Sequence, residues 1–146
     1  MSIRFEHAVD VVQEPGLAFA ILDDVSLTPK WLARCVGIEK LTPGPNAVGT
    51  KLRYSYREGG RTGVMDGEIT ARVPHERLTF RYQDKMMGVT VDFRVSRTAA
   101  GCRVVHAIEI TPKTFFGRLM SPLIRRQLPK QTITAMEALR ALVEGG

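Results

Sequence analysis

A change of hydrophobic period near Pro112 constrains the fold of this chain more than any other feature. Before it, apolar and polar residues alternate over residues 3–12 and in successive segments from 36 to 110, as in strands with one buried face. After it, apolar residues recur every three or four positions, as on one face of a helix. One strand, two short helices, six strands and a long helix predict an α+β fold, with a curved antiparallel sheet gripping the C-terminal helix around a cavity.

Helix-start signals lie between the first and second strands. Pro15 suits the first turn of one short helix. Thr28 and Pro29 suit the start of a second, with Thr28 as its N-cap. The sequence therefore predicts two short helices in tandem.

Glycine and proline also shape the later elements. Gly59-Gly60 predicts a tight hairpin, because adjacent glycines tolerate positive φ at both central turn positions. The last helix is expected over residues 115–144. Pro122 and Pro129 each lack a backbone donor, so they favour kinks or a break in this helix.

Length and composition limit the organisation of the chain. With 146 residues, of which 44% are hydrophobic, residues 1–146 fit a single domain with a sizeable core. No apolar run approaches the roughly 20 residues that span a bilayer, and the N-terminus has no secretory-type segment, so we expect a cytoplasmic protein. Cys35 and Cys102 lie in no Cys/His cluster, which favours free thiols and predicts no metal and no cofactor.

The positive charge of the chain is concentrated near its C-terminus. The formal net charge is +6, and no acidic residue lies between Glu109 and Glu137. This segment has little aromatic interleaving and no nucleic-acid-binding motif, so we expect no nucleic-acid partner. A solvated helix face explains the charge, and weak contact with an anionic membrane surface is the alternative. The basic residues of the segment are Lys113, Arg118, Arg125, Arg126 and Lys130.

Small side chains on the inward face of one strand predict where a cavity lies. Gly67 and Ala71 leave a gap beside Met65, Ile69 and Val73. The residues expected to bind a ligand there are Trp31, Leu52, Tyr54, Tyr56, Met65, Gly67, Ile69, Phe80, Tyr82, Val91, Phe93, His106, Ile108, Leu119, Met120 and Leu123.

A few polar side chains are candidates for chemistry in this cavity. His106 falls on the inward side of its strand and is the candidate acid or base, since histidine titrates near neutral pH. Tyr54 is the candidate that steadies a developing oxyanion. His7, Tyr56 and Tyr82 are further polar groups, and for all of them the alternative is a hydrogen bond satisfied within the core.

Other catalytic patterns are missing from the sequence. It has no nucleophile elbow, no paired carboxylates at readable spacing and no phosphate-binding glycine loop. Strict alternation also places Arg53 and Asp66 outside the cavity. Whether the protein is an enzyme stays open.

Several short segments, spread over nearly the whole chain, carry a resemblance. They include Leu22-Asp23-Asp24 before Pro29-Lys30-Trp31-Leu32, then Val48-Gly49-Thr50, Glu68-Ile69-Thr70, Arg77-Leu78 and Gly101-Cys102-Arg103-Val104. Together they resemble the START-like superfamily, also called SRPBCC, in its polyketide cyclase/dehydrase and lipid-transport branch. The resemblance implies a helix-grip fold, a seven-stranded antiparallel sheet wrapped around the C-terminal helix. It also implies a cavity for a hydrophobic ligand, and it implies no single reaction.

Three hypotheses follow for the function. The first is a carrier or sensor that binds a lipid, fatty acid or polyketide between the sheet and the C-terminal helix. The second is a polyketide cyclase or dehydratase that uses His106. The third is a module that binds a partner or a membrane surface through the basic C-terminal helix, and a homodimer stays open as well.

Overall fold

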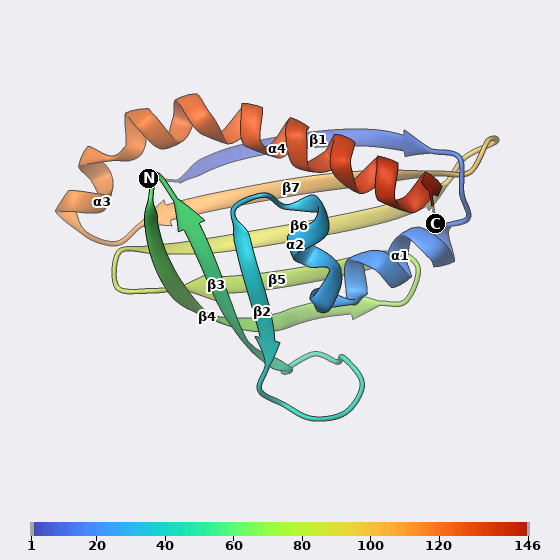
Figure 1. Ribbon diagram of the computed structural model, residues 1–146, viewed down its shortest axis with the longest axis horizontal. Helices are drawn as coiled ribbons and strands as arrows, with labels where there is room; N and C mark the ends of the chain where they lie inside the picture. The colour runs from blue at the N-terminus through green and yellow to red at the C-terminus, as the bar shows by residue number, and fades with distance from the viewer. Residues whose placement is uncertain (1, 146) are drawn as a thin grey trace.

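The computed structural model describes residues 2–145, which form a seven-stranded antiparallel sheet with helices on its concave face (Figure 1). The strands are β1 (Ile3–Val11), β2 (Cys35–Lys40), β3 (Lys51–Glu58), β4 (Arg61–Val73), β5 (Arg77–Gln83), β6 (Met87–Arg97) and β7 (Cys102–Pro112). The helices are α1 (Pro15–Asp23), the 3-10 turn η1 (Val25–Leu27), α2 (Thr28–Trp31), α3 (Phe115–Leu119) and α4 (Ser121–Gly145).

The strand order is β1-β7-β6-β5-β4-β3-β2, so each strand from β2 to β7 pairs with its neighbours in sequence. Strand β1 pairs with β7 instead, with Ile3 opposite Ile110 and Val11 opposite Cys102. The short helices connect β1 and β2, the two edges of the sheet. The predicted α+β arrangement of a curved sheet, two short helices and a long C-terminal helix is confirmed.

The turn signals are confirmed where they are local. Gly59 and Gly60 join β3 to β4 with φ of 58° and 80°, the positive values expected of this hairpin. Helix α1 begins at Pro15, as predicted. The expected N-cap of α2 is wrong, because the chain already turns as η1 and Thr28 is itself helical. Asp24 caps η1 instead, and its Oδ1 accepts from the Ser26 amide at 3.1 Å.

The C-terminal helix is divided in two. Helix α3 ends at Leu119 and α4 begins at Ser121, directly before Pro122, so the predicted break is present. Pro129 lies inside α4. From Leu128 onward, α4 buries one face against β1 and the short helices. The buried residues of this part are Leu128, Thr132, Ala135, Met136, Leu139 and Val143.

Strand β4 departs from strict alternation near its end. The register with β5 shifts between Ile69 and Ala71, where a bulge inserts one residue. Val73 was expected on the inward face, but the shift turns it outward and leaves it 45% exposed, so that expectation is wrong. Arg53 and Asp66 are exposed, as alternation predicted.

An ion pair fixes α1 over the sheet. Arg72 Nη2 on β4 donates to Asp23 Oδ2 at 2.8 Å, and Asn46 Nδ2 donates to Asp23 Oδ1 at 3.1 Å. Burial raises the pKa of Asp23, but the hydrogen bonds from Arg72 and Asn46 outweigh it, so the pKa is lowered overall. Helix α1 is therefore tied to the strand beneath it.

Candidate functional site

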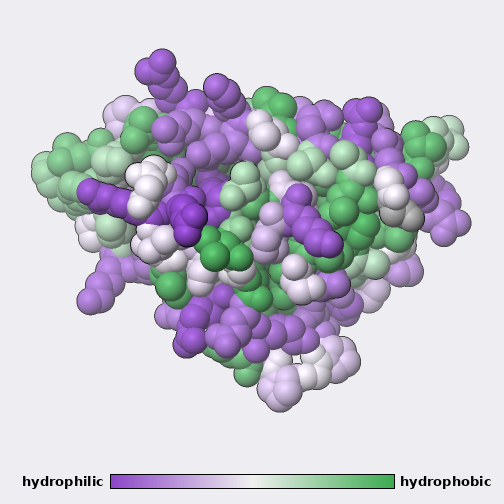
Figure 2. Space-filling model, viewed as in Figure 1, coloured by the Kyte–Doolittle hydropathy of each residue, from purple (hydrophilic) through white to green (hydrophobic). Residues whose placement is uncertain are grey.

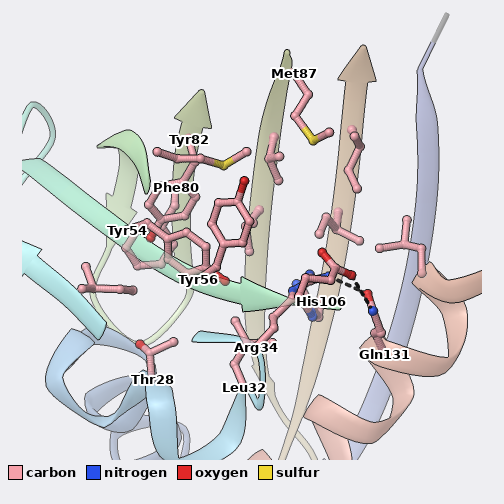
Figure 3. Close-up of a pocket in the computed structure, with 18 of the residues that line it drawn as sticks. Thr28, Leu32, Arg34, Tyr54, Tyr56, Phe80, Tyr82, Met87, His106 and Gln131 are labelled. Carbon is pink, nitrogen blue, oxygen red and sulfur yellow. Dashed lines mark hydrogen bonds between the residues drawn. The ribbon is translucent and has the colours of Figure 1, made fainter. Parts of the chain in front are cut away.

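A cavity of about 170 Å³ lies between the concave face of the sheet, α2 and α4 (Figure 3). Alternate residues of four strands point into it, because successive side chains of a strand face opposite sides. Register brings Phe93 opposite His106, and Val91 opposite Ile108, so these strands present a continuous wall. From α4, Ile124 and Leu128 close the other side. The walls are therefore mostly aliphatic and aromatic.

The gap predicted at Gly67 is filled by an aromatic ring from the neighbouring strand. Gly67 pairs with Tyr82, and a Cβ built on Gly67 would lie 2.4 Å from Tyr82 Cδ1. The Tyr82 ring is 5.0 Å from that of Tyr54 and 5.9 Å from that of Phe80, measured between centroids. Gly67 thus allows an aromatic cluster to form and does not itself open space for a ligand.

His106 is the most unusual side chain in the cavity wall. It is 4% exposed, and its ring stacks on Phe93 at 4.6 Å between centroids. Neither Nδ1 nor Nε2 has a hydrogen-bond partner within residues 2–145. Burial, and then the positive charge of Arg34, lower the pKa of His106 to about 3. His106 is therefore a neutral imidazole at neutral pH, with a donor and an acceptor both unpaired.

His7, the other inward histidine candidate, lies directly opposite His106 in the pairing of β1 with β7. Its side chain is half-buried, and its ring stacks with that of Phe5 at 6.5 Å between centroids. His7 is not among the residues that line the cavity. The inward direction predicted for β1 is right, but it brings His7 beside the cavity and not into it.

Three tyrosines line the part of the cavity nearest β3 and β5. Burial raises the pKa of Tyr54 to about 12 and also raises the pKa values of Tyr56 and Tyr82. All three are consequently neutral phenols at neutral pH. In Figure 3, Tyr56 lies between Tyr54 and His106, which come from strands with three others between them.

A chain of polar side chains crosses the mouth of the cavity. Arg34 Nη1 donates to Gln131 Oε1 at 2.5 Å, and Gln131 Nε2 donates to Glu58 Oε1 at 2.8 Å (Figure 3). These two hydrogen bonds link α4 to the segment before β2 and to the end of β3. Glu58 and Gln127 line the cavity and are also exposed, so this end of the cavity reaches solvent.

The structure brings most of the predicted ligand-binding residues together and separates six of them. Leu52, Gly67 and Ile69 are buried in the core beside the cavity and do not line it. Leu119, Met120 and Leu123 are exposed to solvent and also lie outside it. The predicted residues that do line the cavity are Trp31, Tyr54, Tyr56, Met65, Phe80, Tyr82, Val91, Phe93, His106 and Ile108.

Other lining residues were missed in the sequence. Val89 and Ile110 share the strand faces of Val91 and Ile108, so alternation could have identified them. Glu58 continues the alternation of Tyr54 and Tyr56 on β3, so it could have been identified too. Arg34 lies between α2 and β2, where no period applies. The remaining lining residues are Leu22, Thr28, Leu32, Ile38, Met87, Ile124, Gln127, Leu128 and Gln131.

Other chemistry is limited in the described residues. Between residues 2 and 145, no group of three His, Cys, Asp or Glu side chains could hold a metal ion. Cys35 and Cys102 are buried free thiols, and burial raises the pKa of the Cys35 thiol to about 11. Over the same residues, no helix has both the length and the apolar character to cross a bilayer.

The curved sheet, the helix across it and the cavity between them define a helix-grip protein of the START-like class. The chain belongs to the polyketide cyclase/dehydrase and lipid transport family, whose model matches residues 2–144. No curated protein matches it in sequence.

Solved structures share the fold at low sequence identity. The Zhui aromatase/cyclase from Streptomyces sp. R1128 is 14% identical with a TM-score of 0.81, covering 99% of this chain and 94% of that one. A START superfamily protein from Mycobacterium smegmatis is 14% identical with a TM-score of 0.81, covering 97% of both chains. TTHA0849 from Thermus thermophilus is 15% identical with a TM-score of 0.77, covering 98% of this chain and 97% of that one.

Proposed function

We propose that this protein is a carrier or sensor that binds a hydrophobic or amphipathic small molecule, such as a lipid, fatty acid or polyketide, in the cavity. The observation that carries the proposal is an apolar cavity whose wall holds the buried, unpaired imidazole of His106. Small-molecule sites combine apolar walls with a few placed polar groups. A buried polar group left unpaired costs about 1–3 kcal/mol, and a ligand atom that pairs with His106 would remove this cost.

The size and charge of the cavity narrow the ligand class. An apolar cavity of roughly 150 Å³ holds benzene, so a volume of about 170 Å³ holds one ring or a short length of acyl chain. A larger ligand, such as one with several rings or a long acyl chain, would extend beyond the cavity at the mouth, beside Arg34, or at the end lined by Met87 and Ile124. Because His106 is neutral, its natural partner is an uncharged hydroxyl or carbonyl, whereas a carboxylate or headgroup fits the mouth.

The first test is native mass spectrometry of the purified protein, followed by denaturing extraction of anything bound. We expect a stoichiometric amphipathic or aromatic molecule, or saturable uptake of N-phenyl-1-naphthylamine by delipidated protein. Val91→Phe fills the cavity and should weaken uptake about tenfold or more. Val64→Phe, on the exposed face of β4, is the matched control and should leave uptake unchanged. No saturable uptake, or equal uptake by Val91→Phe, would contradict the proposal.

A second candidate is a cyclase or dehydratase in which His106 transfers a proton and Tyr54 steadies an oxyanion. The presence of both groups in one cavity favours it, as does the aromatase/cyclase named among the similar structures. We rank it second because a histidine with a pKa of about 3 is a weak base and is not protonated at neutral pH. Turnover of a poly-β-keto substrate that survives His106→Ala combined with Tyr54→Phe would exclude this assignment.

The remaining expectations concern partners and location. A homodimer and a cytoplasmic location stay predictions. Contact with an anionic membrane surface, expected from the charge of the C-terminal helix, is independent of what the cavity binds.

A further inference from the structure

Three apolar side chains that the sequence assigned to the cavity are instead part of an exposed surface at one end of the molecule, together with two neighbouring phenylalanines. The three are Leu119, Met120 and Leu123. We call Phe115, Phe116, Leu119, Met120 and Leu123 the apolar cap. Phe115 is 76% exposed, Leu119 is 60% exposed and Phe116 is 55% exposed. Figure 2 shows apolar surface gathered at the end of the molecule where α3 lies in Figure 1. Contiguous exposed apolar surface of this kind marks an interaction site.

The small residues that lie between the cap residues are buried against the protein, whereas the cap residues themselves are exposed. Gly117 is buried, and a Cβ built on it would lie 3.0 Å from the Met86 carbonyl oxygen. Thr114 Oγ1 accepts from the Gly117 amide at 3.0 Å and caps α3. Ser121 is buried at the start of α4. The helix thus turns a glycine toward the protein and its two phenylalanines toward solvent, the reverse of a helix that only completes a core.

Positive charge borders the cap. Arg118, within α3, and Lys113, just before it, are both exposed. On α4, Leu123, Arg126 and Lys130 are spaced three and four residues apart, so they share the solvent side of the helix. The Asp84 carboxylate also lies nearby, where it accepts hydrogen bonds from the backbone amides of Met86 and Met87. The four cations outnumber it. The surface therefore combines exposed apolar groups with a positive border.

We propose that the apolar cap docks this protein on an anionic lipid surface. In this orientation the phenylalanines and leucines enter the boundary between headgroups and acyl chains, and the bordering cations meet lipid phosphates and carboxylates. Peripheral proteins that lie in the interface use the same combination of aromatic and aliphatic side chains with lysine and arginine.

The charge of the border argues against the other occupants. In a symmetric dimer the same patch meets itself, so two basic borders would face each other. A neutral apolar partner would leave the cations unpaired. An anionic bilayer supplies negative charge at its surface and apolar volume beneath it, and so matches both parts of the patch.

The location of the cap relates docking to the cavity. Gly117 packs on the backbone of Met86, whose neighbour Met87 lines the cavity, and Ile124 on α4 lines it as well. Docking would therefore place this end of the cavity next to lipid. The docking itself does not depend on the proposed ligand binding, and each can fail without the other.

The test is co-sedimentation of the full-length protein with vesicles of phosphatidylcholine, with and without about 30 mol% phosphatidylserine. We expect binding to the anionic vesicles that weakens as salt is raised. Phe115→Ser combined with Phe116→Ser and Leu119→Ser should lower the affinity about tenfold or more. The matched control, Val36→Ser with Val48→Ser and Val64→Ser, changes three exposed valines elsewhere and should bind as the wild type does.

Charge and insertion are measured separately. Arg118→Gln with Arg126→Gln should lower both the affinity and its salt dependence, whereas Arg57→Gln with Arg61→Gln, at the β3–β4 hairpin, should not. A tryptophan introduced by Phe115→Trp should shift its emission to the blue on anionic vesicles. The native Trp31 is 5% exposed and already buried, so it should contribute little to that shift.

Several outcomes would overturn the proposal. They are no binding of the wild type, equal binding to neutral vesicles, unchanged binding of the cap variant, or a dimer in solution that the cap variant abolishes. Circular dichroism confirms that each variant is folded. Uptake of N-phenyl-1-naphthylamine by the cap variant, measured without vesicles, shows whether the cavity still functions and so separates this inference from the proposed function.

Discussion

The cavity and the apolar cap depart from the usual distribution of side chains in opposite directions. In the cavity wall, His106 is 4% exposed and both ring nitrogens are unpaired within residues 2–145. At the cap, Phe115 is 76% exposed. Folding alone favours neither arrangement, because buried polar groups seek hydrogen bonds and large apolar groups seek burial. Under the two proposals, a polar atom of a ligand would pair with His106 in the cavity, and an apolar lipid layer would surround the cap.

The largest expected effect is a difference in the free energy of unfolding between substitutions at the two ends of the C-terminal helical region. Leu139 is fully buried in α4, so Leu139→Ala should lower the free energy of unfolding by about 2–5 kcal/mol. Leu123 at the cap is 44% exposed, so Leu123→Ala should change it by less than about 0.5 kcal/mol. Urea denaturation measures both. Equal losses would mean that the cap is part of the folded core, and the comparison would then be wrong.

A second effect tests whether the gap at Gly67 is filled. A Cβ there meets the Tyr82 ring, so Gly67→Ala should destabilise the protein by about 1–3 kcal/mol through displacement of that ring. Gly37, in β2, has no atom within 4 Å of its built Cβ, and Gly37→Ala is the matched control. Thermal unfolding compares the two. If Gly67→Ala is as stable as Gly37→Ala, the space beside Gly67 is open after all.

The sequence predicted the sheet well because its signals are local. Alternation within each strand and the Gly59-Gly60 turn depend on neighbouring residues, and β3 and β4 form as expected. The break before Pro122 is equally local. The bulge after Ile69 has no comparable signal in the sequence, so the outward direction of the Val73 side chain was not predicted.

The candidate site was harder to predict because it depends on residues far apart in sequence. Gly67 looks like empty space until Tyr82, on the next strand, fills it. A spacing of three and four residues shows that Leu119 and Leu123 share a face with other apolar residues, but not whether anything covers that face. Arg34 joins the cavity through its hydrogen bond to Gln131, 97 residues away.

A third effect uses the pH dependence of folding to test the burial of His106. Its pKa is lowered from 6.5 to about 3, so between these values the unfolded chain binds a proton that the folded chain does not. The stabilisation is fully present above pH 6.5 and is lost as the pH falls, by about 1.4 kcal/mol per pH unit.

His106→Phe should therefore flatten the acid side of the stability profile. Between about pH 7.5 and 5.5, the wild type should lose about 1.4 kcal/mol more than this variant, as measured by urea denaturation. The Asp10, Asp23 and Asp92 carboxyls, whose pKa values are lowered, contribute equally to both proteins and cancel. Parallel profiles for wild type and His106→Phe would show that the imidazole is hydrated.

The smallest expected effect on stability concerns the mouth, and it decides by which end a ligand leaves. Gln131→Leu removes the hydrogen bonds to Arg34 and Glu58, which are partly exposed, so it should cost about 0.5–1 kcal/mol. Gln127→Leu is the matched control, one turn earlier on the cavity wall. If the ligand leaves through the mouth, stopped-flow release of N-phenyl-1-naphthylamine should be several times faster in Gln131→Leu than in Gln127→Leu. Equal rates would instead assign release to the end beside the cap, where Met87 and Ile124 line the cavity.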